Sequence, residues 1–272
     1  MKKIITQYIT NTVGQSYIDD LQFTLGDNFS IFNMLNPTTI KHPDSEVNFR
    51  KNHIITSIHS RFNKNIAPMP SHQLRTGNPE SRFLYINGVV TPYPLALHQA
   101  NMLSKAIAQD VELLHNETDG LVRDLIECNE GRYGIWNKAS QDAVDVILDK
   151  LSYAGDLHIV AHSQGAIIVT SAILKIAETA TNNTLSRIKI YTFGAGFKES
   201  ILPDAVEVEH FANSLDPITH MGLQNDGHDY TGTLYLRKNK GHFFIVDYLF
   251  PFISGEFEQG STFSSFIRVP YE

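Results

Sequence analysis

One serine stands where an apolar strand pattern changes to an apolar helix pattern, in the stretch LHIVAHSQGAIIVTSA. Ser163, between Ala161 and Gly165, approximates the G-x-S-x-G pattern of a nucleophile on a sharp strand-to-helix turn. Such a turn holds the hydroxyl above the sheet and directs the N-terminus of the helix toward it. Strand and helix come close there, so the flanking residues must be small, and Ala161 exceeds glycine by one methyl group only. The alternative interpretation is that Ser163 simply caps the helix, a role that serine fills well.

A serine nucleophile needs a base and a group that orients the base, and candidates for both follow Ser163 in the chain. Asp216 lies in HFANSLDPITH, directly after a predicted strand, and His242 lies in KNKGHFFIVDYL, on a short loop before an apolar segment. We expect His242 to be the base and Asp216 to orient it. The alternatives are that Asp216 only forms an Asp-Pro turn, and that His220 or His228 is the base.

Two backbone N–H groups are candidates for stabilising the oxyanion that such a reaction forms. One belongs to Gln164, the residue after the serine, at the start of the predicted helix. The other belongs to Val89 in FLYINGVVTPY, where a strand ends in an Asn-Gly turn. The neighbouring His162 is expected to pack or to line the pocket, because adjacent residues on the turn point apart.

The elements that must position these residues alternate regularly from residue 82 onward. Six short apolar runs predict strands at 83–88, 111–116, 157–163, 187–194, 206–213 and 232–237. Helical spacing predicts helices at 94–110, 120–128, 138–153 and 164–180, and a last apolar segment at 242–250 ends before Pro251. This alternation indicates an α/β fold with a mainly parallel, doubly wound sheet. Sites in such sheets lie at the carboxyl ends of the strands, where Ser163 and Asp216 are expected.

The first part of the chain has a different character. It is rich in Asn, Thr, Ser and His, its periodicity is weak, and residues 63–82 contain three prolines and several turn formers. We therefore divide the chain into an N-terminal extension, residues 1–80, and a catalytic domain, residues 81–272. The extension has scattered apolar residues such as Phe29 and Phe32, which predict either a lid over an acyl pocket or a cover for a sheet edge.

Composition excludes several classes of function. The chain has 272 residues, 42% hydrophobic and 19% charged, with a formal net charge of −7, which is typical of a globular protein and argues against a nucleic-acid binder. Cys128 is the only cysteine, so no internal disulfide can form, and its helical spacing predicts a core position. The sequence contains no H-E-x-x-H, P-loop or G-x-G-x-x-G motif, so we expect no metal and no cofactor.

No signal peptide or membrane-length apolar run is found in the sequence. The expectation is therefore a cytoplasmic protein without an integral membrane segment, with export by a signal-less route, as for an effector, left open. The sequence does not indicate an oligomeric state.

Three segments, YINGVVT, VAHSQGA and IYTFGAGF…HFANSLDPITH…GHFFIVDYL, resemble the α/β-hydrolase superfamily, and within it the lipase-like serine esterases, class 3 lipases in particular. The resemblance covers residues 82–250. By this match Ser163, Asp216 and His242 form a catalytic triad, and the N–H groups of Val89 and Gln164 form the oxyanion hole. The sequence departs from the pattern at Ala161 and at GAGF, where lipases usually show Gly-x-Pro.

The resemblance implies a serine hydrolase without a cofactor that cleaves a carboxylic ester of an acyl or lipid-like small molecule through an acyl-enzyme. A thioesterase, an amidase or an acyltransferase would use the same triad, because the leaving group is selected by the pocket. A hydrolase-fold binding or effector protein without turnover is the remaining alternative.

Overall fold

The computed structural model describes residues 75–78, 80–89, 91, 93–116, 138–197, 200–224, 229–257 and 260–268. Nearly all of the predicted N-terminal extension, the helix predicted at 120–128 with Cys128, and the alternative base His228 lie outside these residues.

Within the described residues, seven strands form one sheet in the order β1-β3-β2-β4-β5-β6-β7. Six of them, from β3 to β7 in that order, run parallel, and the two-residue β1 pairs antiparallel with β3. This confirms the predicted mainly parallel sheet. The strands are β1 (Arg75–Thr76), β2 (Phe83–Ile86), β3 (Val111–Leu114), β4 (Leu157–His162), β5 (Ile188–Phe193), β6 (Glu207–Asn213) and β7 (Thr233–Arg237).

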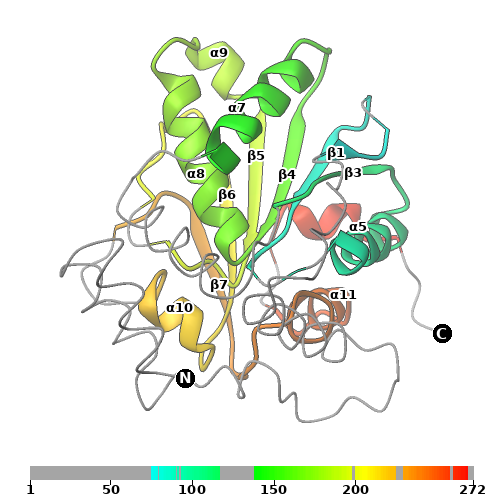
Figure 1. Cartoon of the computed structure of the whole chain (residues 1–272). Coiled ribbons are helices and arrows are strands. Elements are labelled where there is room, and N and C mark those ends of the chain that lie inside the picture. Colours follow the sequence, from blue (N-terminus) through cyan, green and yellow to red (C-terminus); the bar gives the residue numbers. More distant parts are fainter. Residues whose placement is uncertain are drawn as a thin grey trace, which may run out of the picture.

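Helices cover both faces of the sheet, so it is doubly wound as predicted. Figure 1 shows α7 and α8 on one side and α5 and α11 on the other. The helices are α5 (Tyr93–Ile107), α7 (Lys138–Leu151), α8 (Gln164–Ala177), α9 (Asn182–Leu185), α10 (Pro217–Met221), the π-helix η1 (Phe244–Leu249), α11 (Phe250–Ile253) and the 3₁₀-helix η2 (Phe263–Phe266). No helix in the described part of the chain is long and apolar enough to span a membrane.

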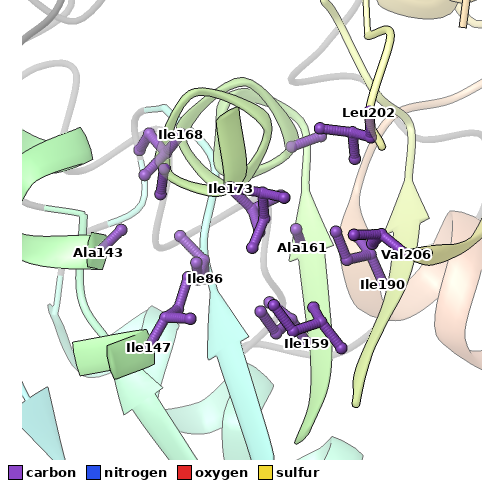
Figure 2. Close-up of a cluster of buried hydrophobic side chains, with 14 of the residues drawn as sticks. Ile86, Ala143, Ile147, Ile159, Ala161, Ile168, Ile173, Ile190, Leu202 and Val206 are labelled. Atoms are coloured by element: carbon purple, nitrogen blue, oxygen red, sulfur yellow. The ribbon is translucent and has the colours of Figure 1, made fainter. Parts of the chain in front are cut away.

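Alternation along the strands sends side chains into two separate cores. In β4, Ile159 and Ala161 point into the core beneath α7 and α8, whereas Val160 points into the core beneath α5 and η1. Figure 2 shows the first of these cores, in which Ile173 of α8 packs over the β4 side chains. All of these side chains are fully buried or nearly so. The central strand that precedes Ser163 is thus fixed from both faces.

The last helical segment differs from its prediction. The chain was expected to leave its helical path before Pro251, but η1 continues directly into α11, which contains this proline. Pro251 lies in the first turn of α11, where its missing N–H breaks no hydrogen bond of that helix. The segment 244–253 therefore forms one continuous helical support behind the loop that carries His242.

Candidate active site

Ser163 occupies a sharp turn between β4 and α8. Its backbone has φ 55° and ψ −120°, a conformation that residues with a Cβ rarely adopt. Its side chain makes no capping hydrogen bond to α8, so the interpretation of Ser163 as an ordinary helix cap is wrong. Its N–H donates to the carbonyl of Phe193, at 3.0 Å, which ties the turn to β5. A serine on a strained turn after a central parallel strand is the arrangement that the α/β-hydrolase fold uses.

The structure explains how the turn accepts alanine at position 161. The Ala161 methyl group is fully buried as part of the hydrophobic core beneath α8 (Figure 2). The close approach occurs at Gly165 instead, because a Cβ there would overlap the carbonyl oxygen of Ile86 and lie 3.1 Å from that of Asn87. Only the second small position of the motif requires glycine.

His242 joins Ser163 to Asp216. Its Nε2 lies 2.8 Å from the Ser163 Oγ, and its Nδ1 lies 2.7 Å from the Asp216 Oδ2. Since Nδ1–H donates to the carboxylate, Nε2 is the acceptor for the serine hydroxyl proton. All three residues are at least 95% buried, at 4% exposure for Ser163, 2% for His242 and 0% for Asp216. These three predicted residues, 26 to 79 positions apart in the chain, are thus brought together in one hydrogen-bonded chain.

Asp216 also caps a helix, so the Asp-Pro interpretation and the site interpretation both describe it. Its Oδ1 accepts the N–H of Ile218, at 2.9 Å, at the start of α10, while its Oδ2 faces His242. The backbone N–H of Ile218 has a fixed direction, so the hydrogen bond that it donates also fixes the orientation of the carboxylate. This directs Oδ2 toward the imidazole.

The other histidines have different partners. The His220 Nε2 lies 2.6 Å from the Ser214 carbonyl oxygen, and this side chain is exposed. His162 is fully buried and its Nε2 donates to the backbone carbonyl of His242, at 2.9 Å, so it packs as predicted and also supports the loop that carries His242. Of the histidines in the described residues, the one that contacts the Ser163 hydroxyl is His242.

Gly194, in the GAGF turn after β5, makes room for the His242 ring. Its φ is +63°, and a Cβ there would lie 3.0 Å from the His242 Cε1 and 3.1 Å from its Nδ1. A side chain at this position would therefore push the imidazole away from Asp216 or Ser163. The glycine of the predicted TFG segment is needed for this close approach.

The loop after β2 lies directly over the serine. A Cβ on Gly88 would be 2.6 Å from the Ser163 Cβ, so the backbone at Gly88 comes too close to the nucleophile to allow a side chain. The carbonyl of Val89 accepts the hydroxyl of Thr91, at 3.0 Å, which holds the loop. The predicted second donor, the Val89 N–H, belongs to this loop.

Buried amide side chains connect this loop to the start of α8. Asn87 bonds twice to Asn116 after β3: its Oδ1 accepts the Asn116 N–H, at 2.9 Å, and its Nδ2 donates to the Asn116 carbonyl, at 3.0 Å. The Asn116 Nδ2 then donates to the Gln164 Oε1, at 2.6 Å. The two segments predicted to supply oxyanion donors are thereby held at a fixed separation. The sequence reasoning missed Asn116, which the pattern VELLHN showed only as the end of a strand.

Tyr248 of η1 was also missed. It is fully buried, and its hydroxyl donates to the Asp216 Oδ2. Burial raises the pKa of Tyr248 well above its usual value, and the negative charge of Asp216 adds to this shift, so the phenol stays protonated and remains a donor. In the sequence it is one tyrosine in an apolar run, and nothing in its spacing marks it.

No group of three or more His, Cys, Asp or Glu side chains in the described residues is arranged to hold a metal ion. The site residues described above are instead connected to one another by hydrogen bonds.

Comparisons with solved structures give several distant likenesses. The chain is similar to a Trichoderma reesei cutinase in complex with a phosphonate inhibitor, at 15% identity and TM-score 0.36, over 71% of this chain and 82% of the cutinase. It is similar to a putative thioesterase from a Silicibacter species, at 12% identity and TM-score 0.41, over 84% and 95%. It is also similar to a thioesterase from the prodiginine biosynthetic pathway of Streptomyces coelicolor, at 11% identity and TM-score 0.39, over 81% and 98%. No protein-family model and no curated protein matches the sequence.

Proposed function

We propose that the protein is a serine hydrolase that cleaves carboxylic esters of acyl or lipid-like small molecules, with residues 81–272 as its catalytic domain. The observation that carries this proposal is the hydrogen-bonded chain Ser163–His242–Asp216, at 2.8 and 2.7 Å, on a serine with a strained backbone. A hydroxyl, an imidazole and a carboxylate in this order are the parts of an acyl-transfer mechanism.

In this mechanism the Ser163 Oγ attacks the carbonyl carbon of the ester while His242 takes its proton. The Asp216 carboxylate holds the Nδ1–H tautomer and stabilises the imidazolium that forms. His242 then gives the proton to the leaving alcohol, and an acyl-enzyme remains. Water, deprotonated by His242, attacks the acyl group and releases the acid and Ser163.

The oxyanion of each tetrahedral intermediate would accept hydrogen bonds from the N–H groups of Val89 and Gln164. The Gln164 N–H is in the first turn of α8, whose N–H groups have no acceptor within the helix. The Gly88 approach to Ser163 supports the assignment of Val89, because it brings that loop within reach of the reacting carbonyl. One such donor contributes about 10²-fold to 10³-fold in kcat.

The test compares hydrolysis of p-nitrophenyl esters by the wild type, Ser163→Ala and Ser200→Ala. Ser200 is a matched control because it is equally buried and its hydroxyl bonds to Thr170, away from His242. We expect Ser163→Ala to lose at least about 10³-fold in kcat/KM and Ser200→Ala to lose little. Equal activity in Ser163→Ala and the wild type would overturn the proposal. A chain-length series, run with matched acyl thioesters, then determines the acyl group and the leaving group.

A further inference from the structure

Tyr248 occupies an unusual position relative to the proposed catalytic groups. Its hydroxyl donates to the Asp216 Oδ2, the same oxygen that accepts the Nδ1–H of His242. The other oxygen, Oδ1, accepts the N–H of Ile218. The carboxylate charge is therefore shared among three donors, two of which meet on the oxygen that faces the imidazole.

The orientation of the phenol is fixed by its surroundings. Its oxygen accepts the N–H of Asn213, the last residue of β6, at 3.3 Å. The Asn213 Nδ2 in turn donates to the carbonyls of Gly241 and Asp247, at 3.1 and 3.0 Å, on either side of the His242 loop and η1. Since the hydroxyl oxygen accepts from a backbone N–H, its own proton is directed toward Asp216.

The π-helical form of η1 is part of this placement. A π-helix is wider than an α-helix and is frequently found at functional sites, because it changes which side chains face the protein interior. In η1 it starts two residues after His242 and places Tyr248 against Asp216. The segment 242–248 thus supplies both donors to the Asp216 Oδ2, His242 from the loop and Tyr248 from η1.

We propose that Tyr248 is a positioning residue that acts through Asp216, holding the carboxylate in place and sharing the charge of the oxygen that faces His242. The proposal rests on the serine hydrolase function proposed above. A hydrogen bond from the phenol withdraws charge from Oδ2, so the carboxylate stabilises the imidazolium less. Removing the phenol should therefore let the carboxylate stabilise the imidazolium more strongly.

The titratable groups that face Tyr248 are few among the described residues. Asp216 receives its proton, Asp247 of the same helix acts on it through its charge, and the rings of His242 and His162 lie 6.4 and 6.1 Å from its ring. Both carboxylates favour the protonated phenol. The Tyr248 hydroxyl donates to the same Asp216 oxygen as the His242 ring, so its effect reaches His242 through that carboxylate.

The test is the pH dependence of kcat/KM for the wild type, Tyr248→Phe and the control Tyr85→Phe. Tyr85 is also fully buried, but its hydroxyl donates to Gln99, at 2.9 Å, and not to Asp216. We expect Tyr248→Phe to lower kcat/KM about tenfold and to move the acidic limb of the profile up by about 0.5 to 1 pH unit, with little change in KM. Tyr85→Phe should leave the limb unchanged.

A spectroscopic readout does not depend on the substrate. The His242 Nδ1–H should give a downfield proton resonance, assigned by its loss in His242→Ala, that shifts in Tyr248→Phe and not in Tyr85→Phe. An unchanged acidic limb and an unchanged resonance in Tyr248→Phe would overturn the inference, as would an equal shift in Tyr85→Phe. If Ser163→Ala keeps full activity, the proposed function fails; if it loses activity while Tyr248→Phe behaves as wild type, only the role of Tyr248 fails.

Discussion

Asp216→Asn is a severe perturbation because the two oxygens of this side chain have different partners. Oδ1 accepts a hydrogen bond from the backbone N–H of Ile218, and Oδ2 accepts hydrogen bonds from His242 and Tyr248. Asparagine offers one acceptor oxygen and one NH₂ donor. The backbone N–H cannot change its role, whereas the imidazole can change tautomer and the Tyr248 hydroxyl hydrogen can turn about its C–O bond. The amide oxygen therefore faces Ile218, and the NH₂ group faces His242.

The consequence is the wrong tautomer at the base. Nδ1 becomes an acceptor from the Asn amide, the ring proton moves to Nε2, and Nε2 can no longer take the Ser163 proton. Where a triad aspartate is replaced in this way, kcat falls by about 10⁴-fold. This corresponds to about 5 kcal/mol of activation free energy, at 1.36 kcal/mol per factor of ten. The fold should be retained, because the cap of α10 is kept.

The assay is p-nitrophenyl ester hydrolysis with kcat and KM determined separately, together with the thermal unfolding midpoint. Asp247→Asn is the matched control, because the Asp247 carboxylate likewise accepts a backbone N–H, that of Phe243, at 2.8 Å. We expect the control to lose less than about tenfold in kcat. The reasoning would be refuted if Asp216→Asn kept more than about a tenth of the wild-type kcat with an unchanged unfolding midpoint.

Three further predictions concern the scaffold. Burial lowers the pKa of His210 to about 4 from 6.5, so the unfolded chain binds more protons between these values, and the free energy of unfolding should fall by about 3 kcal/mol as pH drops from 6.5 to 4. Urea titrations at both pH values should show a smaller fall for His210→Gln. Gly88→Ala puts a Cβ 2.6 Å from that of Ser163 and should lower kcat for ester hydrolysis about 10²-fold. Gly255→Ala is the control, because a Cβ there meets no other atom within 4 Å, and its kcat should stay near that of the wild type. Lys150→Met removes the ion-pair partner, at 2.5 Å, of the buried Glu112. It should lower the free energy of unfolding in urea by about 3 to 5 kcal/mol. Replacing Glu112 with Leu as well should restore most of this; no restoration would refute the explanation.

The sheet was predictable from the sequence because most of its strands are short and largely apolar. Buried parallel strands such as β4 and β5 appear in the sequence as apolar runs that are shorter than a typical helix. The predicted strands β2 to β7 are all confirmed. The convergence of Ser163 and Asp216 also followed from order alone, since the carboxyl ends of parallel strands meet at one edge. The choice among His220, His228 and His242 was not determined by pattern, because loop length does not determine where a ring points.

The residues that the sequence did not reveal are those that depend on register and on backbone form. Tyr248 contacts Asp216 from a π-helix, and an apolar run of nine residues does not show whether its helix is α or π. Asn116 contacts Gln164 only because β3 and β4 lie on either side of β2. The short β1 was missed because a strand of two residues is too short to show an alternating or apolar pattern. The continuation of the helical segment through Pro251 was missed, because the sequence does not show that α11 begins there with the proline in its first turn.

Fluorophosphonate labelling followed by peptide mapping tests the central claim most directly, because the probe reacts covalently with an activated serine hydroxyl. We predict one adduct, on the peptide that contains Ser163. It should be absent in Ser163→Ala, strongly reduced in Asp216→Asn and His242→Ala, and unchanged in His220→Ala. An adduct on a different residue, or undiminished labelling of Ser163→Ala, would contradict the account.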